Sequence, residues 1–98
     1  MMADAKEEPY LIPLISLEQG VFICRGYWGV LRVKELRSAF QQQVEAEKWS
    51  GTFDLSQLGG MDMAGALVLQ EMLLFCDRQG VDTTLRGLAN RFSSLLKF

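Results

Sequence analysis

The chain has 98 residues, of which 49% are hydrophobic and 22% are charged, and its 12 acidic and 10 basic residues give a formal net charge of -2. This composition is typical of one globular domain with a core. The mild acidity argues against nucleic acid as a partner, because binding it needs clustered Lys and Arg. The sequence contains no histidine, which excludes Ser-His-Asp and Cys-His catalytic arrangements.

Motifs for cofactors, metals and membranes are missing from the sequence. It has no GxxxxGK-S/T and no GxGxxG phosphate loop, and Cys24 and Cys76 stand apart in apolar stretches without a CxxC. We therefore predict no cofactor and no metal site, and we expect both cysteines to be reduced core residues. The charged start MMADAKEEP does not fit a signal peptide, and no apolar run approaches the ~18 residues of a membrane span.

These absences predict a protein that is not an enzyme and a segment that does not itself insert into a membrane. A paired-carboxylate hydrolase is the enzyme class that the sequence leaves open. The acidic residues, however, scatter over polar helix faces and the N-terminal tail, where a solvated surface explains them better.

The first half of the chain predicts a hairpin of two strands followed by an amphipathic helix. In chain order we expect a disordered polar tail at 1–9, an edge strand at 10–17, a turn at 18–20, an antiparallel strand at 21–26 and a loop at 27–29. Pro13 restricts the first strand to a sheet edge, since proline cannot donate to a ladder. From residue 33 the apolar side chains recur at spacings of 3, 4 and 4, which predicts a helix lying against a sheet: Val33, Leu36, Phe40 and Val44.

The second half predicts two more strands with a long helix between them. We expect a short central strand at 52–55, a turn at 59–60, a helix at 63–79 stopped by Gly80, a strand at 81–86 and a last helix at 89–98. The order β-β-α-β-α-β-α predicts an α/β fold, a single domain at 10–98 with a mixed β-sheet covered mainly on one face by helices. The apolar ending Leu-Leu-Lys-Phe leads us to expect the N-terminal part of a longer chain rather than a protein that stops there.

The corner between the third strand and the long helix reads Asp62-Met63-Ala64-Gly65. Because Asp62 precedes the helix, its carboxylate is expected to accept from the amide of Ala64 or Gly65 and to favour the positive helix end. Gly65 lets a neighbouring backbone come close to the first turn. The simplest interpretation makes Asp62 only a helix cap, and this role is compatible with a partner surface around it.

Helix spacing separates a core stripe from an apolar patch on the long helix. The expected core stripe consists of Val68, Leu69, Met72, Phe75 and Cys76. Leu67 and Leu74 fall on the polar face, and with Met61 and Met63 they predict an exposed apolar patch of the kind that marks an interface. The alternative is that a neighbouring helix or the N-terminal segment covers them. The aromatic residues near loops are interpreted as lids on the core rather than binding anchors: Tyr27, Trp28 and Trp49.

The strand Asp54-Leu55-Ser56, the corner Asp62-x-x-Gly65 and the stretch Gly-Val-x-Thr-x-Leu-Arg-Gly at 80–87 together resemble the STAS domain (sulphate transporter and anti-sigma factor antagonist). The resemblance covers roughly residues 14–98. It implies a non-catalytic module that binds a partner through this corner and the helix behind it. In the anti-sigma antagonists the corner carries a hydroxyl that a partner kinase phosphorylates, and Ala64 stands at that position here. We therefore predict no phosphoacceptor at the corner.

Another STAS branch fits the corner better. Bacterial ABC transporters of the lipid-asymmetry type carry a cytoplasmic STAS subunit, or a STAS domain ahead of the membrane permease, that docks onto the ATPase. Similar corners there read Thr-Ala, which Ala64 matches and from which Met63 departs. The predicted partner-binding residues are Met61, Asp62, Met63, Ala64, Gly65, Leu67 and Leu74.

The resemblance thus implies a regulatory or assembly domain of a bacterial phospholipid-transporting ABC system. Its partners would be the ATPase subunit and the membrane permease, and its location the cytoplasm at the inner face of the cell membrane. The alternative is a signalling STAS protein of the anti-sigma antagonist type in a partner-switching pathway. A third hypothesis is an enzyme or a nucleotide-binding protein, but the sequence contains no phosphate loop that would support it.

Overall fold

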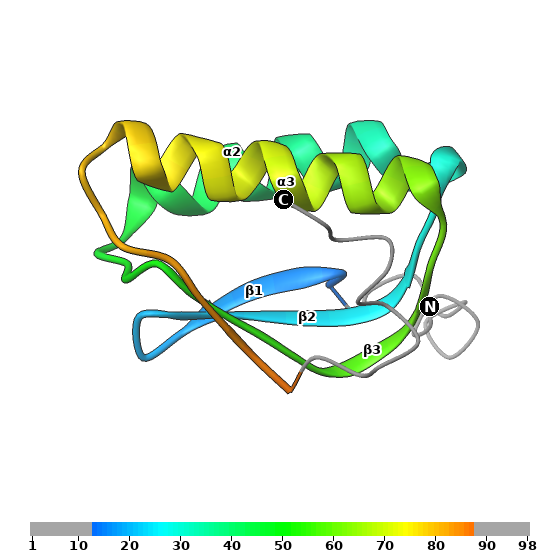
Figure 1. Cartoon of the computed structure of the whole chain (residues 1–98), viewed down its shortest axis with the longest axis horizontal. Coiled ribbons are helices and arrows are strands. Elements are labelled where there is room, and N and C mark those ends of the chain that lie inside the picture. The colour runs from blue at the N-terminus through cyan, green and yellow to red at the C-terminus, as the bar shows by residue number, and fades with distance from the viewer. Residues whose placement is uncertain (1–12, 88–98) are drawn as a thin grey trace, which may run out of the picture.

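The computed structural model describes residues 13–87, and the tail predicted at 1–9 and the helix predicted at 89–98 lie outside the described residues. Within them the chain forms a four-stranded mixed sheet in the order β1-β2-β3-β4, with two helices on one face (Figure 1). The elements are β1 (Ile15–Glu18), β2 (Val21–Trp28), the 3₁₀ helix η1 (Val30–Arg32), α2 (Val33–Ala46), β3 (Thr52–Met61), α3 (Met63–Arg78) and β4 (Thr84–Arg86). The α/β class is confirmed. No helix among the described residues has the length and apolar character needed to cross a membrane.

The two helices share one face because of how the strands are connected. β1 and β2 form an antiparallel hairpin, whereas β2 pairs with β3 and β3 with β4 in parallel. Each parallel step moves one position in the same direction across the sheet, through α2 and then through α3. Since such crossovers are right-handed, both helices pack on the same side, as Figure 1 shows.

The predicted hairpin is confirmed, with a shorter first strand than expected. Gln19 and Gly20 join the two strands with φ of 54° and 82°, the positive values that a two-residue hairpin turn requires. β1 begins at Ile15, so Pro13 lies before the ladder rather than in it. The Gln43 side-chain amide of α2 donates to the Ile15 carbonyl at 2.7 Å and covers part of this sheet edge.

The core lies between the sheet and the helices, and the apolar stripes predicted from the helical spacing face it. On α2, Leu36 and Phe40 are buried, and the two ends of the predicted stripe pack against the core from partly buried positions. On α3 the predicted core stripe is confirmed, with Phe75 only partly buried. Phe22 of β2 stacks on Phe53 of β3 with ring centroids 4.8 Å apart, which joins the two central strands under the helices.

Both cysteines are free thiols in this core, as predicted. Cys24 and Cys76 are fully buried, and burial raises the pKa of the Cys76 thiol to about 11. The pKa of Cys24 is raised by the same desolvation. Neither thiol therefore supplies a thiolate at neutral pH.

Two sequence-based predictions around the central strands are wrong. The expected loop at 27–29 is largely the end of β2, and the expected turn at Gly59-Gly60 lies inside β3, which runs on to Met61. Gly60 makes room for a neighbouring side chain instead of a turn, because a β-carbon there would stand 2.5 Å from Cδ2 of Tyr27.

β3 is longer than its partner because it contains two irregularities. Against β2 it has an extra residue between Asp54 and Gln57 and another between Leu58 and Gly60. The Asp54 carboxylate supports the first by accepting from the Ser56 backbone N–H at 2.9 Å and from its hydroxyl at 2.7 Å. Such bulges bend a strand, and here they aim the end of β3 at the start of α3.

α3 ends as the sequence predicted, and β4 is shorter than predicted. Gly80 adopts a φ of 77°, and its N–H donates to the Asp77 carbonyl at 2.9 Å. The N–H of Val81 donates to the Cys76 carbonyl at 3.0 Å, which completes a Schellman cap. Because Val81 is used in this cap, the strand expected at 81–86 begins only at Thr84.

Candidate functional site

The corner between β3 and α3 is built around the carboxylate of Asp62. This residue is the N-cap of α3, and its Oδ1 accepts from the N–H of Gly65 at 3.0 Å, as predicted. Its Oδ2 accepts from the N–H of Val30 at 3.1 Å. The hydrogen bonds from Gly65 and Val30 hold the pKa of the Asp62 carboxyl below its usual range. One side chain therefore fixes the start of α3 against η1, which lies 32 residues earlier in the chain.

Gly65 brings the first turn of α3 onto the end of β2. It is buried, and a β-carbon there would stand 2.6 Å from the carbonyl carbon of Trp28 and closer still to its oxygen. The same carbonyl oxygen accepts from the N–H of Asp62 at 3.1 Å. The close approach predicted for Gly65 is confirmed, and Trp28 is the residue that it approaches.

Trp28 and Tyr27 point in opposite directions at the end of β2. Trp28 is fully buried, as its predicted role of a core lid requires, and its Nε1 donates to the carbonyls of Leu14 at 3.1 Å and Arg25 at 3.2 Å. Trp49 also packs against the core. Tyr27 was expected to do the same, but the residue is 57% exposed, so that prediction is wrong.

The predicted apolar patch on α3 is present without one of its four members. Met63, Leu67 and Leu74 are 64%, 55% and 46% exposed, whereas Met61 is only 7% exposed and belongs to the core. Met61 is the last residue of β3, and strand alternation carries its side chain inward before the corner turns the chain outward. Ala64 is half-buried in the first turn.

The structure adds three exposed apolar side chains that sequence reasoning missed. Val30 and Leu31 in η1 are 64% and 93% exposed, and Tyr27 precedes them on β2. They lie beside the corner because Asp62 binds the first residue of η1. The available signal was the Val-Leu pair between Gly29 and the helix stripe, which fits neither a helix period nor a strand period.

Two of the cavities that the described residues form lie at different parts of this surface. One of about 280 Å³ lies at η1 and is lined by Tyr27, Gly29, Val30, Leu31, Arg32 and Asp62. The other, of about 630 Å³, lies between α3 and β4 and is lined by Gln70, Leu73, Leu74, Asp77, Thr83 and Leu85. Leu74 therefore borders a separate cavity, two helical turns beyond Leu67.

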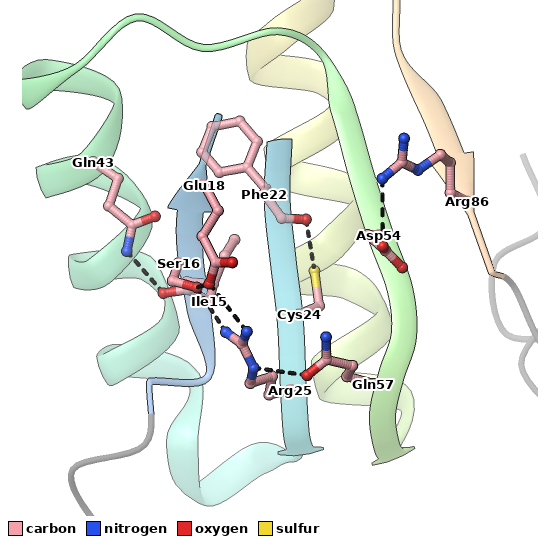
Figure 2. A network of polar contacts seen from close by, with 10 residues as sticks. All are labelled: Ile15, Ser16, Glu18, Phe22, Cys24, Arg25, Gln43, Asp54, Gln57 and Arg86. Carbon is pink, nitrogen blue, oxygen red and sulfur yellow. Dashed lines mark hydrogen bonds and ion pairs between the residues drawn. The ribbon is translucent and has the colours of Figure 1, made fainter. Parts of the chain in front are cut away.

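A second polar cluster lies on the face of the sheet away from the helices (Figure 2). Arg25 follows the core residue Cys24 in β2 and so points to the other side. Its guanidinium donates to the side chains of Ser16 at 2.7 Å, Glu18 at 3.0 Å and Gln57 at 2.9 Å, which ties three strands together. The pKa of Glu18 is lowered by its bonds to Ser16 and Arg25. These groups use one another as partners, which indicates a structural role.

The side chains at the corner between β3 and α3 suit contact with a partner rather than a chemical reaction. Both oxygens of Asp62 accept backbone N–H groups, and its neighbours in the first turn are a thioether, a methyl group and a glycine. Among residues 13–87, no cluster of three or more His, Cys, Asp or Glu side chains is placed to hold a metal ion. What the arrangement offers is a fixed backbone frame with apolar side chains around it.

Comparisons with known proteins give no match, either to a protein-family model or, at a significant level, to a curated protein. The resemblance to STAS domains therefore stays a prediction from the residues.

Proposed function

We propose that this chain is a non-catalytic STAS-type docking domain of a bacterial phospholipid-transporting ABC system, and that it binds the cytoplasmic ATPase through the Asp62 corner. The observation that carries the proposal is the exposure of Met63 and Leu67 on a helix whose start is fixed by contacts with two other elements, η1 and β2. Exposed apolar side chains grouped on one surface are typical of protein interfaces.

The rigidity of the corner supports a docking role. Asp62 fixes the start of α3 to η1, and Gly65 seats its first turn on β2. A surface that is already ordered loses little conformational entropy on binding, so a larger part of the contact energy appears as affinity. The methionine adds a flexible apolar side chain that adapts to an irregular partner surface.

In this proposal, Met63 and Leu67 form the centre of the interface and Leu74 extends it along α3. The spacings of four and seven residues keep the three side chains on one helix face. Asp62, Ala64 and Gly65 shape the backbone beneath, while Met61 supports the corner from the core. The membrane permease is the second partner, and the domain works in the cytoplasm at the inner face of the membrane.

A signalling role in a partner-switching pathway is the alternative, and it needs a phosphoacceptor near the corner. Ala64 offers no hydroxyl, and the exposed hydroxyl of β3, Ser56, donates to the Asp54 carboxylate at 2.7 Å. Incubation with ATP and a partner kinase of the anti-sigma type, followed by intact-mass measurement, separates the roles. A phosphate on Ser56 together with loss of partner binding would favour signalling.

The direct test is binding to the ATPase subunit of a phospholipid-transporting ABC system from the same organism, by co-purification and by calorimetry of the purified proteins. We expect a complex of defined stoichiometry that does not depend on phosphorylation. Failure of the purified proteins to associate, with or without nucleotide and permease, would refute the proposed function.

A further inference from the structure

The ring of Tyr27 is exposed and yet held in one place. A β-carbon on Gly29 would stand 2.7 Å from its Cε1, and one on Gly60 would stand 2.5 Å from its Cδ2. Two glycines therefore leave the space in which the ring lies against the backbone, while 57% of the residue stays open to solvent. An aromatic side chain with few free torsions gives contact area at a low entropic cost.

The ring forms one wall of the cavity at η1, which we call the Tyr27 groove. Its other lining residues include Val30 and Leu31, and its volume is about 280 Å³. Pockets for drug-sized molecules hold roughly 300–1,000 Å³, so this groove lies just below that range. Its size and its apolar walls suit one large side chain of a protein better than a free ligand.

The charges around the Tyr27 groove cancel. Its two charged lining residues, Arg32 and Asp62, carry opposite charges. Arg32 binds Glu35 through two hydrogen bonds of 2.7 and 2.9 Å, and both oxygens of Asp62 accept backbone N–H groups. The lining thus offers no excess of positive charge for phosphate groups or anionic membranes, and its apolar walls match an uncharged apolar group.

We propose that the Tyr27 groove receives an apolar side chain of Leu, Met or Phe size from the protein partner, with Tyr27 and Leu31 as the anchoring residues. This inference deepens the proposed function and rests on it for the identity of the partner, the ATPase. The groove and α3 meet at Asp62, so the inserted side chain lies beside the contact made by Met63. Buried Tyr residues in such pockets are frequent binding hot spots.

The groove is tested first without the ATPase, using N-acetyl-leucine methylamide as the probe in an NMR titration of the full chain. We expect saturable shifts at the backbone amides of residues 27–32. Leu31→Ser should abolish them and leave the melting temperature unchanged, since Leu31 is 93% exposed. Leu74→Ser is the matched control, because Leu74 borders the other cavity, and it should leave the shifts intact. Absence of shifts, or shifts confined to residues around Leu74, would overturn the proposal.

The second measurement is the affinity for the purified ATPase. Leu31→Ser should weaken binding about tenfold or more, the size of a hot-spot loss, and Leu31→Met should restore most of it. If the ATPase binds wild type and Leu31→Ser equally, the groove proposal fails while the proposed function stands. If the ATPase does not bind at all, the proposed function fails and the probe titration alone decides the groove. A third measurement is sedimentation of the chain with vesicles of phosphatidylglycerol and phosphatidylcholine. If wild type sediments with the vesicles and Leu31→Ser does not, the surface binds lipid, and this result would also overturn the proposal.

Discussion

Gly65 and Trp28 touch where α3 starts above the end of β2. A β-carbon on residue 65 would stand 2.6 Å from the Trp28 carbonyl carbon, and the hydrogen bond from the N–H of Asp62 to the carbonyl oxygen holds this carbonyl in place. The close contact between the first turn of α3 and the end of β2 therefore requires that residue 65 has no β-carbon. Both elements are fixed by backbone contacts, so neither yields at low cost.

We predict that Gly65→Ala destabilises the fold. Alanine in a helix is favoured over glycine by about 1 kcal/mol, but overpacking against backbone costs typically 1–3 kcal/mol and occasionally more, so the clash decides the sign. Chemical denaturation of both proteins measures the difference. The matched control is Gly59→Ala, whose β-carbon would meet ordinary contact at 3.5 Å from the Gly26 carbonyl oxygen and nothing closer among residues 13–87. Equal stability of Gly65→Ala and wild type would show that the first turn of α3 moves freely.

Adjacent residues of α3 allow a sharp test of its two faces. Val68 is 1% exposed and Leu67 is 55% exposed. Val68→Asp places an unpaired carboxylate in the core and should cost several kcal/mol, against a total stability of roughly 5–15 kcal/mol. Leu67→Asp should change stability by about half a kcal/mol, as surface substitutions do. Thermal melting of both variants decides, and similar curves would mean that the helix faces are wrongly assigned.

Local signals in the sequence were sufficient to predict the α/β class, the helical stripes and the caps of α3. The Asp62 cap and the Gly80 stop depend on neighbours within a few residues, so their chemistry is visible in the chain itself. The binding of Asp62 to Val30 joins residues 32 apart, and no local pattern reveals it.

The errors concern residues whose environment comes from other strands. Gly60 looked like a turn because glycine is common in turns, whereas it makes room for Tyr27 from the neighbouring strand. Met61 looked exposed because it was counted with the helix start, although it ends β3 with its side chain in the core. Tyr27 and Leu31 join the surface only through tertiary contacts at the corner.

The Asp62 cap predicts a specific dependence on pH. The folded-state pKa of Asp62 is depressed, so its stabilising contribution is present above the unfolded-state value near 3.8 and is lost as pH falls through the folded-state value. Asp62→Asn keeps a cap oxygen but removes the charge at the helix start. We expect a lower melting temperature than wild type at pH 7 and a gap that closes as the pH falls below about 4.

Other acidic groups with lowered pKa values share in the acid destabilisation, so the difference between the two proteins is the relevant quantity. The carboxyl groups concerned remain in both proteins and cancel in that difference: Glu18, Glu35, Asp54 and Glu71. A gap of the same size at pH 7 and at pH 2 would mean that the Asp62 charge does not act through the cap.

The last prediction concerns docking, and it uses Met63→Glu. Met63 is 64% exposed in the first turn of α3, where an added acid interacts favourably with the helix dipole, so the isolated domain should melt close to wild type. In a desolvated interface the same carboxylate would lose its water without gaining a partner, and losses of about 2 kcal/mol or more are expected at a central position. Calorimetry with the ATPase and thermal melting of the free chain are measured on the same preparations.

The matched control is Gln42→Glu, which adds the same charge to an exposed position of α2, outside the corner, and should leave the affinity unchanged. Equal losses in both variants would mean that net charge weakens binding, whereas full affinity of Met63→Glu would place the contact on another part of the domain.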